Sequence, residues 1–291
     1  MLYRAEGLLD LSRVVSMKIV LVGAGSLGSL IAENLCYPWR EFVIIDPDRF
    51  GPENVERHLL GPGWCGKPKA AGVAKYMLQR GTTRVLDIFA KAEKALDRHR
   101  DANLIIIATG GMDFPSWINQ WNSDGLNIPL ISGGIYPKGQ GGELLVLPNP
   151  QLVCLACSEA QYPTDISGGG RTNYGMEQHD QAIPGLRHVV SLIASLAANF
   201  ALQIVHNGEL ESQLIRWVDN WGTVTMFSKG GGSIKETLES WSFRSQSMFG
   251  STPSVRAVRE DGYTKILAKE TVFHLPVKRF ARCSFHEEAV S

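Results

Sequence analysis

The chain of 291 residues contains little cysteine and no excess of charge of either sign. Five cysteines are few for this length and odd in number, which argues against a disulfide scaffold. Lysine plus arginine and aspartate plus glutamate both total 29, so the chain lacks the basic excess that non-specific nucleic-acid binding needs. We therefore expect neither a disulfide-stabilised domain nor a nucleic-acid partner.

A secretory signal and an uninterrupted membrane span are also missing. The N-terminal residues MLYRAEGLLDLSR contain no basic segment followed by a long apolar run. The longest apolar stretch, Val189 to Val205, has a polar residue at every fourth position, which predicts a core helix with one polar stripe. We therefore expect a cytoplasmic protein without membrane contact. The stripe consists of Ser191, Ser195, Asn199 and Gln203.

Strand and helix signals alternate through the first half of the chain. Short continuous apolar runs, typical of strands buried on both faces, are separated by stretches of helical periodicity. This alternation predicts a parallel, doubly wound α/β sheet. The predicted strands cover residues 18–22, 42–45, 84–89 and 104–107, and the predicted helices begin near Ser26 and Pro68.

The second half has a different pattern. Strands are predicted at 129–132 and 143–147, on either side of a glycine-rich turn. Two further strands, at 214–218 and 223–227, are predicted to pair as a hairpin. The expected fold class is α/β, a Rossmann-like doubly wound sheet with a parallel N-terminal half and mixed or antiparallel C-terminal strands.

A glycine loop follows the first predicted strand and opens the first predicted helix. Gly23, Gly25 and Gly28 form the pattern G-x-G-x-x-G, which permits a tight turn and close approach of the backbone to a phosphate. Asp46 ends the next strand, where an acidic residue can bind ribose hydroxyls. The pattern predicts a nucleotide site and fits NAD or ATP. The alternative is a glycine-rich packing turn.

Two cations beyond the second strand favour ATP over NAD. Asp48 is followed by Asn54 and Arg57, and then by Lys69 at the start of a helix. A nicotinamide enzyme does not need these cations, whereas fixed cations neutralise the charge that builds on a triphosphate when an acyl group attacks. The alternative is that Arg57 is a solvated loop residue and Lys69 a helix-start lysine.

The combined pattern resembles the ThiF/MoeB/HesA family, the adenylating fold of ubiquitin-activating enzymes. The resemblance runs from Lys18 to about Val205 and includes the glycine loop, D-x-D, N-x-x-R and G-x-P-K motifs. It implies a single adenylation domain over residues 1–291, with a nucleotide-binding half at 1–130. The half at 131–291 would bind a ubiquitin-like protein and contain a crossover loop at 161–185 and a zinc site.

The resemblance also implies an activity. ATP and the C-terminal carboxylate of a ubiquitin-like protein would give an acyl-adenylate and pyrophosphate, with Mg²⁺ bridging the phosphates and an aspartate. The implied partners are the tail of that protein, a conjugating enzyme and a second copy in a homodimer. The catalytic candidates are Arg57 and Lys69, and the cofactor-binding candidates are Gly23, Gly25, Gly28, Asp46, Asp48, Asn54, Arg57, Lys69 and Asp113.

Three departures from the family pattern concern catalysis. Family members usually have T-D-N after the fourth strand, where the aspartate helps to hold magnesium. Gly110 occupies that position here, and Asp113 either substitutes or caps the next helix. An arginine that reaches a partner's ATP site has no recognisable counterpart, although Arg4 or Arg13 could serve. The loop at 161–185 also lacks the cysteine that takes a thioester or persulfide.

Two other cysteines are candidates for that relay only by default. Cys36 follows a core helix and is predicted to be structural. Cys65 lies in a glycine-rich loop near Lys69, where a cation could lower the pKa of the thiol. We expect adenylation without a relay through the protein's own cysteine, so that the acyl group passes directly to a partner.

Two short pairs near the second half and the C-terminus are metal-ligand candidates. Cys154 and Cys157 form C-x-x-C, while Cys283 and His286 form C-x-x-H. The resemblance implies that the four residues form a closed structural Zn²⁺ site that ties the C-terminal strands to the core. The alternatives are a redox pair at Cys154 and Cys157, or two unrelated pairs.

The expected function is adenylation in a bacterial ubiquitin-like conjugation pathway. One alternative is a degenerate, non-catalytic partner subunit of an activating enzyme. Others are a sulfur-carrier-protein adenylyltransferase in cofactor biosynthesis and an enzyme that adenylates a small substrate or RNA base. An NAD-dependent oxidoreductase is disfavoured by the N-x-x-R and G-K-P-K segments.

Overall fold

The chain folds into two compact units. The first unit comprises residues 1–109, 128–134 and 190–210, and the second comprises 110–127, 135–189 and 211–291. The structure, a computed structural model, describes residues 9–109, 114–123, 126–136, 141–161, 187–207, 210–218, 224–229, 254–260, 263–269, 271–281, 283 and 285. Residues 162–185 of the predicted crossover loop lie outside these ranges.

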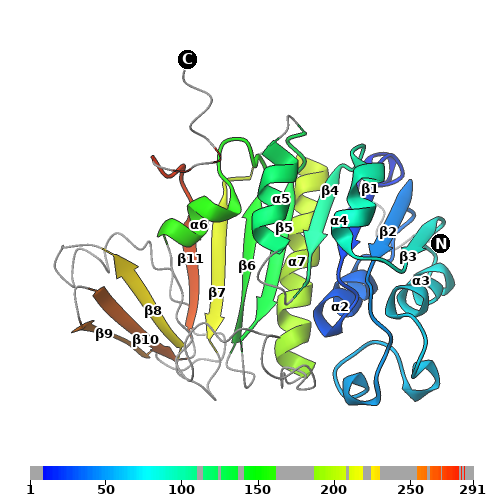
Figure 1. The fold of residues 1–291 in the computed structure, drawn as a ribbon, viewed down its shortest axis with the longest axis horizontal. Coiled ribbons are helices and arrows are strands. Elements are labelled where there is room, and N and C mark those ends of the chain that lie inside the picture. Colours follow the sequence, from blue (N-terminus) through cyan, green and yellow to red (C-terminus); the bar gives the residue numbers. More distant parts are fainter. Residues whose placement is uncertain are drawn as a thin grey trace. The chain divides into compact units, whose positions relative to one another are not determined.

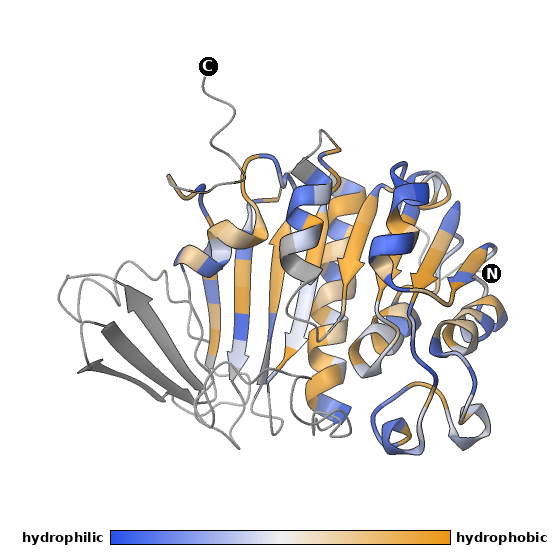
Figure 2. Ribbon diagram, in the orientation of Figure 1, coloured by the Kyte–Doolittle hydropathy of each residue, from blue (hydrophilic) through white to orange (hydrophobic). Residues whose placement is uncertain are grey.

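Five parallel strands form the sheet of the first unit (Figure 1). Every residue of β1 and β4 is buried, as expected of strands covered on both faces. Figure 2 shows the same strands as hydrophobic throughout most of their length. The predicted parallel half is therefore confirmed. The strands are β1 (Lys18–Val22), β2 (Glu41–Ile45), β3 (Val85–Ile88), β4 (Leu104–Ile107) and β5 (Leu130–Ile135).

Two helices begin where the sequence predicts them. α2 (Ser26–Asn34) follows the glycine loop, and α3 (Lys69–Gln79) begins directly after Pro68. The two helices contact each other, and α3 packs on β2 and β3. The shorter helical segments are α1 (Leu11–Val14), η1 (Pro52–Asn54), η2 (Pro62–Trp64), α4 (Ala92–Ala95) and η3 (Leu96–His99).

The long apolar helix is α7 (Arg187–Asn207). Val189 and Ile193 are fully buried, whereas Ser195 and Asn199 are exposed, so the polar stripe and the apolar face separate as predicted. By length and composition α7 could cross a membrane, but only half of its most apolar window lies buried in the fold. This is weak evidence for a membrane span, because the core helix of a soluble protein passes the same test.

The second unit contains antiparallel strands. β6 (Gly141–Leu147) pairs with β7 (Gln213–Val218), which pairs on its other side with β11 (Thr271–Pro276). A separate three-stranded antiparallel sheet has the order β8-β10-β9. Its strands are β8 (Val224–Lys229), β9 (Ser254–Glu260) and β10 (Tyr263–Lys269), and the helices of this unit are α5 (Phe114–Ser123) and α6 (Leu155–Gln161).

The main sheet has eight strands in the order β11-β7-β6-β5-β4-β1-β2-β3. Its parallel N-terminal strands and antiparallel C-terminal strands confirm the predicted α/β, Rossmann-like class. The order β3-β2-β1-β4-β5 is that of a doubly wound nucleotide-binding sheet, whose ligands bind at the carboxyl ends of the strands.

The predicted hairpin between residues 214–218 and 223–227 is wrong. β7 has β6 and β11 as its neighbours, while β8 belongs to the small sheet and pairs with β10. Both edges of β7 are already used by the strands on either side, so no edge remains for β8. Strand signals on either side of a short turn predicted local pairing, but long-range pairing prevailed.

Candidate nucleotide site and cysteine cluster

The three glycines of the loop have separate roles. Gly23 has φ +93°, and a Cβ there would lie 2.6 Å from the carbonyl oxygen of Ala108. A Cβ on Gly28 would lie 1.9 Å from the carbonyl oxygen of Gly23, so close packing of helix on strand excludes a side chain. A Cβ on Gly25 would meet nothing within 4 Å. Gly23 and Gly28 therefore shape the turn, and Gly25 faces open space.

The peptide of Ala24, inside the loop, is held from two sides. Its N–H donates to Oδ2 of Asp46 at 2.6 Å, and its carbonyl oxygen lies 2.7 Å from Nε2 of His58. Nδ1 of His58 accepts the N–H of Leu60 at 3.0 Å, so Nε2 carries the proton that Ala24 accepts. The end of β2 and the turn after Arg57 therefore fix the loop's backbone.

The carboxylate of Asp46 is buried and hydrogen-bonded to the backbone of its own chain, a role that the predicted ribose contact did not include. It is only 4% exposed, and its second oxygen accepts the N–H of Asp48 at 2.7 Å. Burial raises the pKa of Asp46, while the two backbone N–H bonds act in the opposite direction. Asp46 therefore orients the glycine loop, and a ribose contact stays a prediction.

Arg57 lies at the start of α2. Its Nε donates to Oγ of Ser26 at 2.9 Å, and Ser26 is the first residue of the helix. Burial lowers the pKa of Arg57, but a guanidinium stays cationic at any physiological pH. Gly25, at the N-cap, supplies no side chain to cap the first N–H groups of α2. A fixed cation and a helix N-terminus thus converge on one place, an arrangement that favours an anion.

Lys69 and Asn54 complete the predicted set in the first unit. Lys69 is buried, and its Nζ forms a 2.9 Å ion pair with Asp48, whose own side chain is largely exposed. The backbone N–H of Lys69 also donates to the carbonyl oxygen of Asp48. The amide of Asn54 donates to Oε1 of Glu53 at 2.8 Å. The ammonium group of Lys69 is therefore fixed by an ion pair and is not freely solvated.

These features fit the triphosphate of ATP. The open space at Gly25, the uncapped start of α2 and the Arg57 guanidinium are the elements that bind a phosphate in a doubly wound fold. Thr109 lies just beyond the carboxyl end of β4. Its buried Oγ1 has no hydrogen-bond partner among the described residues. Gly110 and Asp113, on which the magnesium prediction rests, lie outside the described residues.

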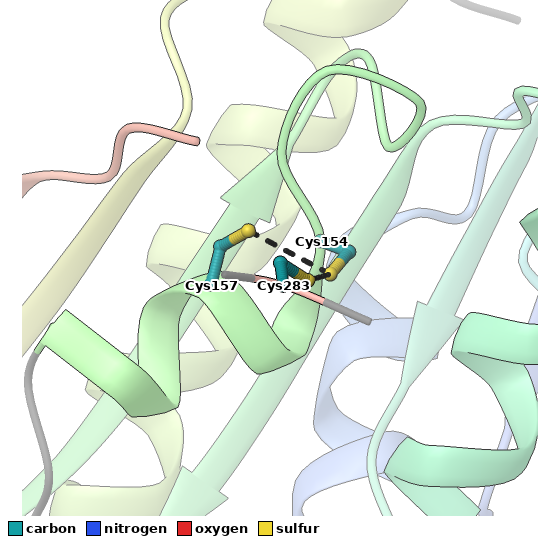
Figure 3. Close-up of side chains that lie close together, drawn as sticks. All are labelled: Cys154, Cys157 and Cys283. Carbon is teal, nitrogen blue, oxygen red and sulfur yellow. Dashed lines mark hydrogen bonds between the residues drawn. The ribbon is translucent and has the colours of Figure 1, made fainter. Parts of the chain in front are cut away.

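Three cysteines of the second unit meet in a buried cluster (Figure 3). Sγ of Cys154 lies 3.8 Å from that of Cys157 and 3.6 Å from that of Cys283. A tetrahedral zinc with Zn–S bonds of about 2.3 Å needs neighbouring sulfurs roughly 3.8 Å apart, and the observed spacing fits. His286, the predicted fourth ligand, lies outside the described residues.

The thiols influence one another's protonation. The pKa of Cys157 is lowered, chiefly because its sulfur accepts a hydrogen bond from Cys154, and the backbone N–H of Phe280 adds a second one at 3.4 Å. The same hydrogen bond to Cys157 raises the pKa of Cys154, and burial adds to the effect. All five cysteines are free, so the structure contains no disulfide at this pair. Three sulfurs gathered in one buried place are the soft ligands that zinc prefers.

Polar side chains hold the two segments that carry these cysteines. Oδ1 of Asn119, on α5, accepts the N–H of Leu155 at the start of α6 at 3.2 Å. The Gln161 amide donates to the carbonyl oxygens of Cys157 and Lys278, and its Oε1 accepts the N–H of Lys278 at 3.2 Å. Gln161 therefore joins α6 to the C-terminal segment that leads to Cys283.

The remaining predicted residues are placed as follows. Cys36 donates to the carbonyl oxygen of Ala32, and burial raises the pKa of its thiol to about 11, which makes it a poor nucleophile at neutral pH. Cys65 is exposed. Arg13 donates to the last carbonyls of α7, those of Val205 and His206, so it caps a helix of its own chain. Arg4 lies outside the described residues.

The sequence reasoning missed the residues that hold the site together. Ser26, His58 and Thr109 stand at the nucleotide site, and Asn119 and Gln161 stand beside the cysteines. Ser26 and His58 directly adjoin motif residues, which is the one signal that could have pointed to them. The other contacts join distant segments and leave no local pattern.

The comparison with protein families identifies one family. The sequence pattern of the ThiF family matches residues 1–225. No curated protein sequence matches the chain. Solved structures are similar at low identity, which shows the fold alone.

Three solved structures illustrate the likeness. Escherichia coli MccB with ATP has 17% identity and a TM-score of 0.58, covering 77% of this chain and 66% of its own. The same enzyme with MccA has 15% identity and a TM-score of 0.63, covering 98% and 70%. PaaA has 16% identity and a TM-score of 0.53, covering 72% and 62%. The chain thus spans less than two thirds of the length of two of these three structures.

Proposed function

The chain belongs to the ThiF family, and from this membership we propose that it is an ATP-dependent adenylyltransferase acting on the C-terminal carboxylate of a ubiquitin-like protein. The observation that carries the proposal is the convergence of Arg57 and the uncapped start of α2 beside the open space at Gly25. An acyl-adenylating enzyme must bind and stabilise the phosphates of ATP, because their negative charge increases when the carboxylate attacks. A glycine-rich packing turn would need neither the cation nor the open space.

In the proposed reaction a carboxylate oxygen attacks the α-phosphorus of ATP. The new bond is a mixed carboxylic–phosphoric anhydride, and the bond from the α-phosphorus to the bridging oxygen breaks. Pyrophosphate leaves with the electron pair. Arg57 and Lys69 stabilise the negative charge on the phosphates as it shifts toward the leaving group. The exposed carboxylate of Asp48 would help to hold Mg²⁺, which would lower the repulsion between the phosphates and the attacking carboxylate.

Lys69 enters this reaction from an ion pair with Asp48. Because Asp48 is largely exposed, the pair can exchange one carboxylate for a phosphate at little cost in desolvation. Asp48 would then be released toward Mg²⁺ or solvent. Asp46, which stays tied to Ala24 and Asp48, keeps the loop in register throughout.

The cysteines support transfer of the acyl group directly to a partner. Cys36 has a raised thiol pKa, and Cys154, Cys157 and Cys283 are buried together in the second unit. Among the described residues only Cys65 is an exposed thiol. We propose that the acyl-adenylate is consumed by a partner, and that the three clustered cysteines hold a structural Zn²⁺.

A second substrate class is favoured by the structural neighbours. MccB has been solved with ATP and with its peptide substrate MccA. These likenesses favour the terminal carboxylate of a shorter chain than a ubiquitin-like protein as the alternative acceptor. The chemistry at the α-phosphorus is the same for both.

The test is ATP–pyrophosphate exchange in the presence of candidate carrier proteins and of peptides. Each candidate is used with a free C-terminal carboxylate and, as the matched control, with an amidated one. We expect exchange with the free form only, because an amide cannot form the anhydride. Equal exchange with both forms, or none with any candidate while ATP binds, would contradict carboxylate adenylation.

A further inference from the structure

A tryptophan ring with two lysines against it stands on the surface of the first unit. Trp64 belongs to η2, in the segment between β2 and α3. Its ring lies directly on α3, because a Cβ on Gly72 would come within 3.0 Å of the ring atom Cε3. Glycine at this point of the helix therefore lets the ring sit closely on the backbone, which fixes its position.

The ammonium groups of Lys67 and Lys75 lie over this ring. Nζ of Lys67 is 5.3 Å from the ring centre, and Nζ of Lys75, on α3, is 5.9 Å from it. Nζ of Lys67 also donates to the carbonyl oxygen of Gly63 at 3.0 Å. Attraction to one π-system thus holds two like charges close together in spite of their mutual repulsion.

No carboxylate offsets these two charges within the described part of the chain. The buried Lys18 and Lys69 both form ion pairs, with Glu41 and Asp48 among their partners. Lys67 and Lys75 are exposed, and among the described residues neither forms an ion pair. Their charges are positioned by a ring and a carbonyl group, so they stay available to carboxylates that approach from solvent.

The composition of this surface indicates a protein as its ligand. Tryptophan is enriched at the centre of protein interfaces, whereas charged side chains form the rim. Trp64 is partly buried and the two lysines around it are exposed, which is the same arrangement. A nucleic acid needs a broader basic face, and this chain has as many acidic as basic residues. The small extent of the surface fits a weak, transient complex.

We propose that Trp64, Lys67 and Lys75 form a docking surface for an acidic segment of a partner protein. Carboxylates of that segment pair with the two ammonium groups, and its apolar atoms pack on the exposed part of the ring. None of the three residues belongs to the proposed nucleotide site. Docking and adenylation can therefore fail independently of each other.

The experiment measures the binding of a fluorescein-labelled oligoglutamate peptide by fluorescence anisotropy at low ionic strength. Excess ATP is present, so that a nucleotide site is filled and cannot take the probe. An oligoglutamine peptide and an oligouridylate of the same length are the uncharged and the nucleic-acid probes. The variants are Trp64→Leu and the double variant Lys67→Gln with Lys75→Gln. The matched control is Lys91→Gln with Lys94→Gln, which removes two exposed lysines elsewhere in the first unit.

We expect the wild type to bind oligoglutamate and not oligoglutamine. The Lys67 and Lys75 double variant should bind oligoglutamate about fivefold more weakly, and the control double variant should change the affinity by less than about twofold. Trp64→Leu should also weaken binding, because both lysines keep their charge but lose the ring that positions them. Thermal melts confirm that each variant is folded.

The docking surface is overturned if the wild type does not bind oligoglutamate, or if binding is unchanged in Trp64→Leu or in the Lys67 and Lys75 double variant. An equal loss in the control double variant, or tighter binding of oligouridylate, overturns it as well. ATP–pyrophosphate exchange should be unchanged in the Lys67 and Lys75 double variant, so a failure of adenylation appears in a separate measurement.

Discussion

The two candidate centres are assembled in different ways. The nucleotide site draws mainly on residues 23–69, a short stretch in which consecutive strands, turns and helices bring their ends to one edge of a parallel sheet. The cysteine cluster joins Cys154 and Cys283, which are 129 residues apart. Chain topology alone places the first centre, whereas the second exists only when a distant C-terminal segment docks. The nucleotide site should therefore stay intact when the cysteine cluster is lost.

The largest expected effect comes from breaking the cysteine cluster. Cys154→Ser removes a buried thiolate ligand, so we expect loss of the bound zinc and of about 3 kcal/mol or more of stability. Cys65→Ser, which changes an exposed cysteine, is the matched control. Zinc content is measured by elemental analysis and stability by chemical denaturation. Full zinc occupancy in Cys154→Ser would contradict the metal assignment.

The converse change tests the nucleotide site without touching the second unit. Arg57→Ala should reduce ATP–pyrophosphate exchange about 100-fold or more, because it removes a cation that stabilises charge on the phosphates. Zinc content should stay the same. Arg40→Ala, at an exposed arginine paired with Asp101, serves as the control. Exchange within a factor of two of the wild type in Arg57→Ala would remove Arg57 from the mechanism.

The stability of the first unit should depend on pH through His99, which lies at the amino ends of the strands, opposite to the nucleotide site. His99 is buried near Lys18, Glu41, Asp101 and Arg98, and its ring nitrogens have no hydrogen-bond partner among the described residues. Burial, helped by the charge of Lys18, lowers the pKa of His99. The unfolded chain therefore binds a proton as pH falls below about 6.5 while the folded chain does not, so stability falls.

We expect His99→Leu to lose less stability than the wild type between pH 7.5 and pH 5.5 in urea denaturation. The apolar side chain of leucine, which is comparable in size to that of histidine, removes the proton uptake and needs no hydrogen bond. ATP affinity should be unaffected, since His99 lies at the amino ends of the strands. An identical pH dependence in both proteins would show that other groups control it.

The smallest expected effect concerns Arg13. Its guanidinium caps the last carbonyls of α7, so Arg13→Ala should cost about 0.5–1 kcal/mol of stability. Nucleotide affinity should not change, because the side chain serves its own helix. A tenfold loss of ATP affinity with unchanged stability would instead indicate that Arg13 reaches a nucleotide site in a second copy.

The same contrast explains how much could be predicted. β1 and β4 match their predicted ranges because strands buried on both faces appear as unbroken apolar runs. The pairing of β7 was mispredicted because nothing local shows that both of its edges are taken by β6 and β11. The predicted domain halves, homodimer and cytoplasmic location stay predictions.

The candidate sites follow the same rule. Spacing within one βαβ segment predicted the glycine loop, Arg57 and Lys69, and the structure places Arg57 and the loop together. For the cysteines, spacing gave two pairs, and only the family resemblance joined them. His58 and Gln161 were missed because each acts through a backbone carbonyl, a contact that no residue pattern records.

The central claim is that a carboxylate attacks the α-phosphorus of ATP, and oxygen isotope transfer tests it most directly. An accepted substrate is labelled with ¹⁸O in its C-terminal carboxylate, turned over with ATP, and the nucleotide product is analysed by mass spectrometry. We predict AMP that carries one ¹⁸O atom, because the bridging oxygen of the anhydride stays with phosphorus when the acyl group leaves. Unlabelled AMP, or ADP as the product, would contradict the account.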